Sequence, residues 1–163
     1  MKLDLSAYGV AEQEDYYKIK NLEEYPWIVG DDSIEQVMMI YSIQIIKNLP
    51  MFMEELYRVC KNGAVIRVMA PYYTNEKSIG DPSLVRQINE YTFAHFDKEF
   101  RKINFADNGP FKNINFKVKG FDYQWVEEQF NVWKNKSEEA KAYARRHYWN
   151  VIDTIVADIE VIK

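Results

Sequence analysis

Two apolar runs of strand length stand out in the first half of the chain. Residues 34–40 are mostly apolar without strict alternation, and residues 64–70 form a second run in which only Arg67 is charged. Continuous runs of this kind are typical of strands that are covered on both faces in a parallel sheet. The pattern therefore predicts two buried parallel strands.

The segment between these runs predicts a helix over residues 50–60. Its apolar residues recur at helical spacing, and Pro50 suits the first turn of a helix. Residues 61–63 end with Gly63, which can adopt the left-handed conformation that closes a helix. Strand, helix and strand in this order predict a parallel unit with a right-handed crossover.

Shorter elements are predicted on both sides of this unit. Residues 2–5 and 16–19 are strand candidates near the N-terminus. After the second apolar run, a loop extends to Pro82, and a helical stretch then runs through Phe96. These segments would extend the parallel unit into an α/β domain.

The last third of the chain alternates apolar and polar residues. Residues 114–119 and 155–161 both have this period of two, which indicates strands with one wet face. Between them, residues 136–149 predict a helix with Ser137 as its N-cap. We expect the two strands to pair antiparallel at the edge of the sheet.

The basic residues Arg145, Arg146 and His147 allow two interpretations. They could form an anion or nucleic-acid patch, but they also lie in the last turn of the predicted helix. Positive charge in a last turn offsets the helix dipole, so the helix-dipole interpretation is favoured.

Composition indicates one globular domain spanning residues 1–163. Apolar residues make up 47% of the chain and aromatic residues 15%, and no Gly/Ser or Pro tract marks a linker. The formal net charge of -4 argues against nucleic-acid binding through bulk positive charge.

Cysteine and histidine are too few for the common metal sites. Cys60 is the only cysteine, which excludes an intrachain disulfide and a multi-Cys zinc cluster and favours a reducing compartment. Cys60 also lies on the apolar face of the predicted helix, so a packing role is favoured over a nucleophilic one. His95 and His147 are the only histidines. We therefore predict no metal site.

The sequence predicts no membrane span. The most apolar run, residues 37–46, is interrupted by Ser42 and Gln44 and has roughly half the length needed to cross a bilayer. The N-terminus lacks the basic region and apolar core of a signal peptide. A cytoplasmic location is the resulting expectation.

Several segments share their order and spacing with those of a known family. These segments are Leu22-Glu23-Glu24-Tyr25-Pro26-Trp27, Asp31-Asp32-Ser33-Ile34-Glu35-Gln36-Val37, Leu49-Pro50, Glu55-Leu56-Tyr57-Arg58-Val59, Lys61-Asn62-Gly63, Gly80-Asp81-Pro82, Tyr91-Thr92-Phe93 and Arg145-Arg146-His147-Tyr148-Trp149-Asn150. Together they resemble the small class I S-adenosylmethionine-dependent methyltransferases, and the resemblance covers most of residues 22–163.

The resemblance implies a Rossmann-like α/β fold. Its sheet would be a class I methyltransferase sheet, mostly parallel with an antiparallel C-terminal edge, and shortened at the N-terminus. In this family the cofactor sits at the carboxyl ends of the parallel strands, at the topological switch point. The resemblance thus implies S-adenosylmethionine as cofactor and an unidentified small or macromolecular methyl acceptor as partner.

Two alignments place the N-terminal strand differently. In the first, residues 3–9 match the family's first strand and Gly-rich turn but offer only one glycine, Gly9. In the second, residues 2–5 match the family's second strand, and Asp4 becomes the acid that holds the ribose hydroxyls. In both alignments we expect residues 2–5 to fill the central slot of the sheet. If that slot were empty, the flanking strands would have unpaired backbone groups in the core, each at a cost of about 1–3 kcal/mol.

Candidate site residues follow from the resemblance. The cofactor-binding candidates are Asp4, Ser6, Gly9, Asn21, Tyr41 and Ser42, and the substrate-binding candidates are Tyr72 and Tyr73. Asp4 could instead be a plain turn residue at the end of its strand, which is the favoured alternative. For the tyrosines and Ser42 the alternative is packing.

The chain departs from the family at positions that matter for catalysis. After its fourth strand the family often carries a His and an acidic residue, where this chain has Gln44, Lys47 and Asn48. Relatives often have another His after the Gly-Asp-Pro segment, where this chain has Leu84. An Asp commonly contacts the adenine, where this chain has Asn21. Groups able to act as a general base near neutral pH are therefore replaced by groups that cannot.

Two functions of different class remain after these observations. One is methyl transfer from S-adenosylmethionine, resting mainly on proximity and orientation. The other is a catalytically inactive relative that serves as a scaffold or partner-binding module. Apolar surface left by the shortened sheet could then be covered by an identical subunit, giving a homo-oligomer, or by a different one.

Overall fold

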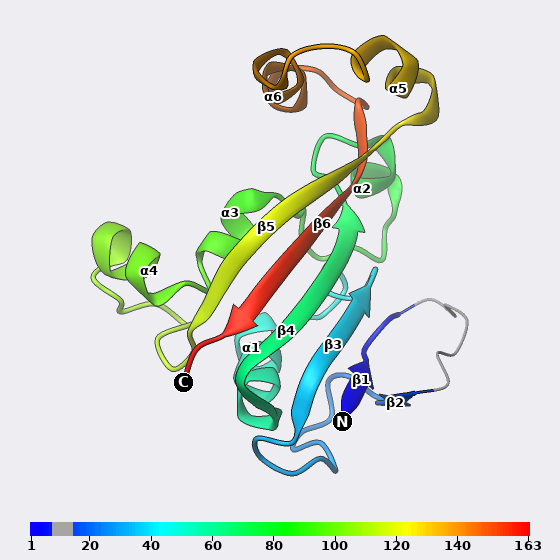
Figure 1. Cartoon of the computed structure of the whole chain (residues 1–163). Coiled ribbons are helices and arrows are strands. Elements are labelled where there is room, and N and C mark those ends of the chain that lie inside the picture. Colours follow the sequence, from blue (N-terminus) through cyan, green and yellow to red (C-terminus); the bar gives the residue numbers. More distant parts are fainter. Residues whose placement is uncertain (8–14) are drawn as a thin grey trace.

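One mixed sheet organises the chain, and the computed structural model describes residues 1–7 and 15–163. The strand order is β2-β1-β3-β4-β6-β5 (Figure 1). The first four strands in this order pair parallel, whereas β6 pairs antiparallel with both β4 and β5. The expected α/β sheet with an antiparallel C-terminal edge is confirmed. The strands are β1 Lys2–Asp4, β2 Tyr16–Lys18, β3 Ile34–Ile40, β4 Cys60–Pro71, β5 Phe116–Trp125 and β6 Ile152–Val161.

The short strand β1 lies inside the sheet. Lys2 pairs with Tyr16 of β2 on one side and with Gln36 of β3 on the other. Hydrogen bonds continue past the strand, since the Leu5 N–H donates to the Met38 carbonyl at 2.8 Å. Residues 2–4 therefore form an inner strand, as expected, although β1 lies next to the edge strand β2 rather than at the centre of the sheet.

Helix α1 forms the predicted crossover between β3 and β4. The Asn48 side chain accepts a hydrogen bond from the Met51 N–H, and Pro50 lies in the first turn, where its missing N–H is harmless. The helices are α1 Leu49–Val59, α2 Glu76–Gly80, α3 Glu90–Ala94, α4 Lys98–Phe105, α5 Glu127–Trp133 and α6 Glu138–His147.

Gly63 has the predicted left-handed conformation but does not close α1. The helix ends at Val59, and Cys60 is already extended as the first residue of β4. Gly63 has φ 80° within β4, where the register with β3 shifts. The glycine therefore permits an irregularity in the strand.

Helices after β4 differ most from the sequence prediction. The expected helix through Phe96 is reduced to α3, whereas α2 occupies the predicted loop, and α4 and α5 were not predicted. Tertiary contacts account for the shorter length of the helix expected through Phe96. The Arg86 guanidinium donates to the carbonyls of Ile43 and Lys47, so the segment around Arg86 crosses the loop after β3. The helix predicted over residues 136–149 is present as α6, with Ser137 as its N-cap.

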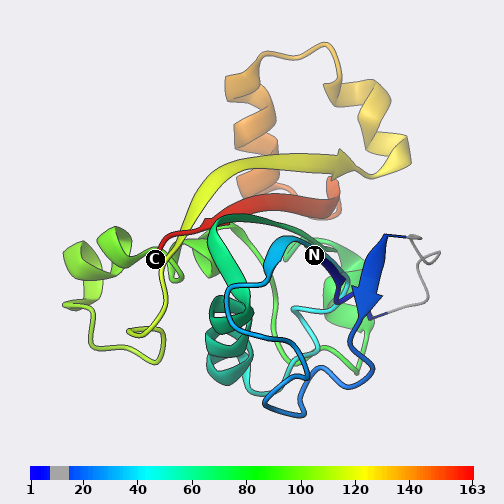
Figure 2. The same cartoon turned by 60° about the horizontal axis from the view of Figure 1, so that its bottom comes forward.

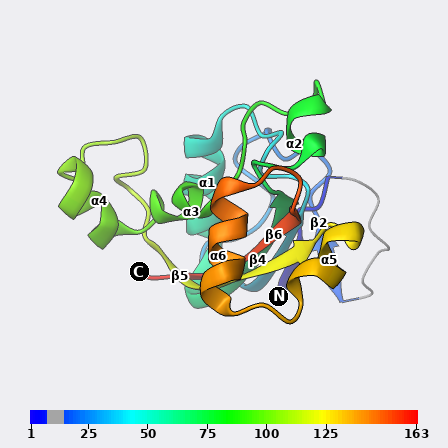
Figure 3. The same ribbon diagram turned by 90° about the horizontal axis from the view of Figure 1, so that it is seen from above.

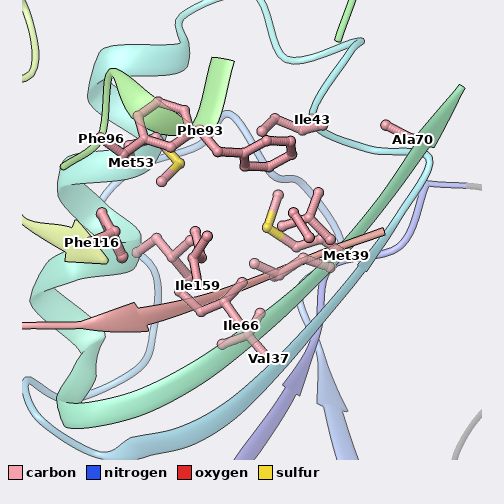
Figure 4. Packing of buried hydrophobic residues seen from close by; sticks show 14 of the residues in the cluster. Val37, Met39, Ile43, Met53, Ile66, Ala70, Phe93, Phe96, Phe116 and Ile159 are labelled. Carbon is pink, nitrogen blue, oxygen red and sulfur yellow. The ribbon is translucent and has the colours of Figure 1, made fainter. Parts of the chain in front are cut away.

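A single apolar core fills the space between the sheet and the helices. Val37 and Met39 of β3 and Ile66 of β4 point toward Met53 of α1 and Phe93 of α3 (Figure 4). These side chains are at most 3% exposed. Burying them supplies the main favourable term for folding.

The face of β4 that points away from α1 is partly exposed. Burial alternates along β4, so that Val65 is 41% exposed while its neighbours Ala64 and Ile66 are buried. Figure 2 shows the teal helix α1 below the strands and the yellow and orange helices α5 and α6 above them. The prediction that both central strands are covered on both faces is wrong, because an apolar run does not reveal whether a second layer exists.

Matched substitutions in β4 test this one-sided burial. We expect Val65→Thr to change the free energy of unfolding by less than about 0.5 kcal/mol. Val68→Thr, at a position 1% exposed, should lower it by about 1–3 kcal/mol because a hydroxyl is buried. Urea denaturation measures both. An equal loss at Val65, together with a dimer in sedimentation, would show that a second copy covers this face.

Helices α5 and α6 form a pair beyond the carboxyl end of β5 (Figures 1 and 3). The Trp125 ring of β5 stacks on Trp133 of α5, with 6.3 Å between the ring centroids, and Trp133 also contacts Tyr148. The basic last turn of α6 therefore lies beside the edge strand β5, where Arg145 contacts the Tyr123 ring.

Glu55 on α1 anchors the loop that leads into β3. Its carboxylate is buried and accepts hydrogen bonds from the Trp27 N–H at 2.7 Å and from Arg58. Arg58 also contacts Asp31 and the Val29 carbonyl. The hydrogen bond from Arg58 is the main cause that lowers the pKa of Glu55.

This lowered pKa predicts acid sensitivity. A carboxyl with a lower pKa in the folded than in the unfolded state stabilises the fold above the unfolded pKa, about 4.5. The contribution is lost as the pH falls through the folded pKa. Glu55→Gln should therefore lower stability at neutral pH and flatten its decline in acid, as measured by urea denaturation across pH. Glu99→Gln, which removes an exposed pair with Lys102, is the control and should have little effect. An unchanged acid slope in Glu55→Gln would contradict the assignment.

Candidate functional site

The carboxyl ends of β1 and β3 meet at one edge of the sheet. The Ser6 Oγ accepts a hydrogen bond from the Ile40 N–H at 3.1 Å, and the Ala7 N–H donates to the Ile40 carbonyl at 3.0 Å. These contacts hold Ser6 close to the start of the turn at Tyr41 and Ser42. Four of the predicted cofactor-binding residues, counting Asp4, are therefore brought to the same edge.

Asp4 makes the contact expected of a turn residue. Its side chain is 6% exposed, and its Oδ1 accepts a hydrogen bond from the Ser6 N–H at 2.9 Å. The carboxylate therefore stabilises the turn that follows β1. Its role as a ribose ligand stays a prediction.

Ser6 and Asn21 share a hollow of about 290 Å³, which we call the strand-end hollow. The Asn21 Oδ1 accepts from the Glu23 N–H, and the Glu23 Oε1 accepts from the N–H groups of Lys47 and Asn48. These oxygens of Asn21 and Glu23 thus bind backbone N–H groups of the chain itself. Gly9, the remaining cofactor-binding candidate, lies outside the described residues. The strand-end hollow is lined by Ser6, Ala7, Lys18, Ile19, Lys20, Asn21, Leu22, Glu23, Ile45 and Ile46.

Tyr41 and Ser42 follow β3 in an unusual backbone turn. Tyr41 has φ 53°, in the left-handed region, and its hydroxyl lies 3.1 Å from the Thr154 Oγ1. Ser42 is fully buried, and its Oγ has no hydrogen-bond partner among the described residues. The same holds for the Gln44 Oε1, which belongs to a second hollow, of about 440 Å³, beside Tyr41.

The two charged side chains of the second hollow are both engaged by neighbouring residues. Its lysine, Lys77, forms an ion pair with Asp153 at 2.6 Å, and this hydrogen bond raises the pKa of Lys77. The amine therefore stays protonated near neutral pH. Asp81, the carboxylate of this hollow, accepts from both the N–H and the Oγ of Ser83, so it is held in a local turn.

Tyr72 and Tyr73 line a separate and larger cavity of about 510 Å³, the tyrosine pocket. Their rings meet edge to face, with 4.8 Å between centroids. The two predicted substrate residues are therefore brought together, in a pocket that does not include the strand-end candidates. The tyrosine pocket is lined by Tyr72, Tyr73, Asn89, Glu90, Tyr91, Tyr123, Arg145 and Arg146.

Glu90 organises the tyrosine pocket from the first turn of α3. The Tyr123 hydroxyl donates to its Oε1 at 2.6 Å, and the Tyr72 hydroxyl donates to the same carboxylate at 3.1 Å. Burial first, and then the Glu90 carboxylate, raise the pKa of both tyrosines. Both hydroxyls therefore keep their protons and hold the carboxylate in place.

Sequence reasoning missed Glu90 and Tyr123. Glu90 follows an ordinary N-cap, Asn89, and nothing local links it to a strand more than thirty residues later in the chain. A signal existed in β5, where Phe121, Tyr123 and Trp125 alternate with polar residues and so share one face of the strand.

Other reactive side chains of the described chain are occupied by packing. Cys60 is fully buried, and burial raises the pKa of its thiol to about 12, which confirms the packing role. The His95 ring stacks on Phe105 with 5.0 Å between centroids. Within residues 1–7 and 15–163, no group of three or more His, Cys, Asp or Glu side chains could hold a metal ion. No helix in the same residues is long and apolar enough to cross a membrane.

Comparisons with known proteins identify the fold. No protein-family model matches the sequence, and no curated protein matches it. Among solved structures, the Haloferax volcanii complex of the Trm112 methyltransferase activator with a methyltransferase aligns at a TM-score of 0.50 and 14% identity, over 93% of this chain. A Thermotoga maritima S-adenosylmethionine-dependent methyltransferase gives 0.50 and 14% over 91%. The [4+2]-cyclase SpnF gives 0.53 and 11% over 91%.

The alignments cover only part of these neighbours. This chain spans 64% of the Haloferax chain, 64% of the Thermotoga chain and 57% of SpnF. At such identities the likeness concerns the fold alone. The fold is Rossmann-like, and it is the fold of methyltransferases.

Proposed function

We propose that this chain is a catalytically inactive relative of the methyltransferases that works as a binding module. The observation that carries the proposal is the use of strand-end acceptors by the chain's own backbone. At the carboxyl end of β1, the Asp4 Oδ1 and the Ser6 Oγ accept from the N–H groups of Ser6 and Ile40. The side-chain oxygens that would accept hydrogen bonds from a cofactor's hydroxyls instead accept them from backbone N–H groups of the chain.

S-adenosylmethionine does not fit the described residues of the strand-end hollow. Its ribose hydroxyls would need a carboxylate that they can reach, yet Asp4 is 6% exposed and the Oε1 of Glu23 already accepts two backbone N–H groups. Displacing the Asp4 carboxylate would leave the buried Ser6 N–H unpaired, at a cost of about 1–3 kcal/mol. The mechanism we propose therefore contains no step through this cofactor.

The fold by itself does not require methyl transfer. SpnF, whose structure aligns with this chain, is a [4+2]-cyclase. Function resides in the site that a fold carries rather than in the fold. The Haloferax neighbour was solved in complex with an activator protein, which supports the idea that chains of this fold associate with protein partners.

Methyl transfer remains the second candidate, favoured by the position of the strand-end hollow. The hollow lies at the carboxyl end of β1 and is bordered by Ser6 and Asn21, where ligands bind in open α/β sheets. In this alternative S-adenosylmethionine would supply the methyl group, the described residues would orient it, and Tyr72 and Tyr73 would contact the acceptor. Proximity and orientation would be the main source of rate.

Titration calorimetry with S-adenosylmethionine and with its demethylated product distinguishes the two candidates. We expect no saturable heat from either and no rise in melting temperature at millimolar ligand, because only a ligand of the folded state stabilises it. Saturable binding that is weakened by Asn21→Ala would overturn the proposal in favour of methyl transfer. Asn131→Ala, on α5 outside the lining of the hollow, is the matched control and should change nothing.

A further inference from the structure

The tyrosine pocket carries an unused cationic wall. Arg145 and Arg146 come from the last turn of α6 and line the pocket opposite a group of aromatic rings. Across residues 1–7 and 15–163, no ion pair joins either guanidinium to a carboxylate. The helix-dipole interpretation explains their place in the sequence, but it does not explain why both face one cavity.

Arg145 is held in an orientation suited to recognition. Its guanidinium carbon lies 4.2 Å from the centroid of the Tyr123 ring. A guanidinium that stacks on an aromatic face keeps its N–H donors directed outward in its own plane. Those donors match the geometry of a carboxylate or phosphate, which can accept two parallel hydrogen bonds.

The charges of the pocket favour an anion at one end. Two arginines and one glutamate line it, which leaves one net positive charge. Glu90 is fixed by the hydroxyls of Tyr72 and Tyr123, so an anionic group would be repelled from α3 and directed to α6. The pocket therefore has a polarity that would orient a bound ligand.

Aromatic rings define the rest of the ligand. Tyr72 presents its ring edge-on to Tyr73 and to Tyr123, with 4.8 and 5.9 Å between centroids. Tyr72 is 1% exposed, so its ring supports its neighbours. The less buried rings of Tyr73, Tyr91 and Tyr123 would contact a further planar ring by stacked or edge-to-face packing. The cavity of about 510 Å³ has the size of a small-molecule site.

We propose that the tyrosine pocket binds a planar aromatic anion, with its ring among the tyrosines and its carboxylate or phosphate on Arg145 and Arg146. The site is distinct from the strand-end hollow, and its occupation does not require S-adenosylmethionine. The binding module proposed above would therefore take a planar aromatic anion as its ligand.

Three probes that share one ring system test this proposal by calorimetry on the full chain. Naphthoate and naphthyl phosphate carry the two anionic groups, and naphthol is the neutral control. We expect at least one of the two anions to bind roughly tenfold or more tightly than naphthol, since charge-assisted hydrogen bonds are the stronger ones. The anion that binds more tightly identifies the preferred group. No saturable heat from either anion at millimolar concentration, or equal affinity for anions and naphthol, would overturn the proposal.

Variants then locate the anion. R145Q/R146Q should weaken the binding of the preferred anion roughly tenfold or more and leave the affinity for naphthol unchanged. R67Q, at an exposed arginine on β4 that pairs with Asp158, should change neither. If the double variant has a lowered melting temperature, R146Q alone replaces it, because Arg146 is exposed. Equal losses in R67Q and in the α6 variant would assign the effect to overall charge and overturn the site.

Discussion

Phe52→Ala should lower the free energy of unfolding by about 3–5 kcal/mol, through lost burial and the cavity left behind. Phe52 lies on the sheet-facing side of α1 and is fully buried, with its ring edge-to-face against Trp27 at 5.5 Å between centroids. Because α1 is the crossover helix between β3 and β4, the lost contacts lie at the centre of the parallel unit. Urea denaturation followed by circular dichroism measures the loss.

Met51→Ala, one residue earlier on the same helix, is the control. Met51 is 48% exposed, so its truncation should change stability by less than about 0.5 kcal/mol. A comparable loss in both variants would mean that the face of α1 assigned to solvent is covered by another subunit. A small loss in Phe52→Ala would mean that the core packs differently from Figure 4.

Arg101→Leu should lower the free energy of unfolding by about 3 kcal/mol, because it leaves buried acceptors without a donor. The Arg101 guanidinium is 2% exposed, and its Nε lies 2.7 Å from an Asp107 oxygen. Its other nitrogens donate to the carbonyls of His95 and Ile114 at 3.0 and 2.6 Å. The value lies at the low end for a broken buried pair because the Asp107 side chain is 19% exposed and water can reach it.

Arg67→Leu provides the comparison for this prediction. Arg67 also pairs with an aspartate, Asp158, but its side chain is 51% exposed. Exposed pairs contribute little, so the loss should stay below about 1 kcal/mol. Equal losses at the two arginines, measured by urea denaturation, would contradict the assignment of Arg101 as the buried link between α4 and the segment that leads into β5.

The predicted site and the structural site overlap only in part. Tyr72 and Tyr73 were predicted from their position after the second apolar run, since the carboxyl end of a parallel strand is where ligands gather. The partners that make their pocket, Glu90 and Tyr123, come from a short helix and from an edge strand. Their contact depends on how α3 packs on β5, which no local pattern encodes.

Asp4 illustrates the same limit at the other end of the sheet. The sequence placed a carboxylate at the end of β1 and left two roles open for it. Its hydrogen bond with the Ser6 N–H is a local turn contact, whereas the Ser6 Oγ accepts from the Ile40 N–H of β3, more than thirty residues away. The binding-module proposal rests on both contacts, and only the second depends on the tertiary structure.

The sequence by itself determined the unit of β3, α1 and β4, with Pro50 in the first turn of the helix, and the antiparallel pair of β5 and β6. Hydrophobic periodicity and helix capping are local signals, so these elements could be read without neighbours. Only the tertiary structure decided that one face of β4 is partly exposed, that Gly63 lies within a strand, and that Arg145 lies against Tyr123. Burial and long-range side-chain contacts depend on which elements meet, and that is fixed only when the whole chain packs.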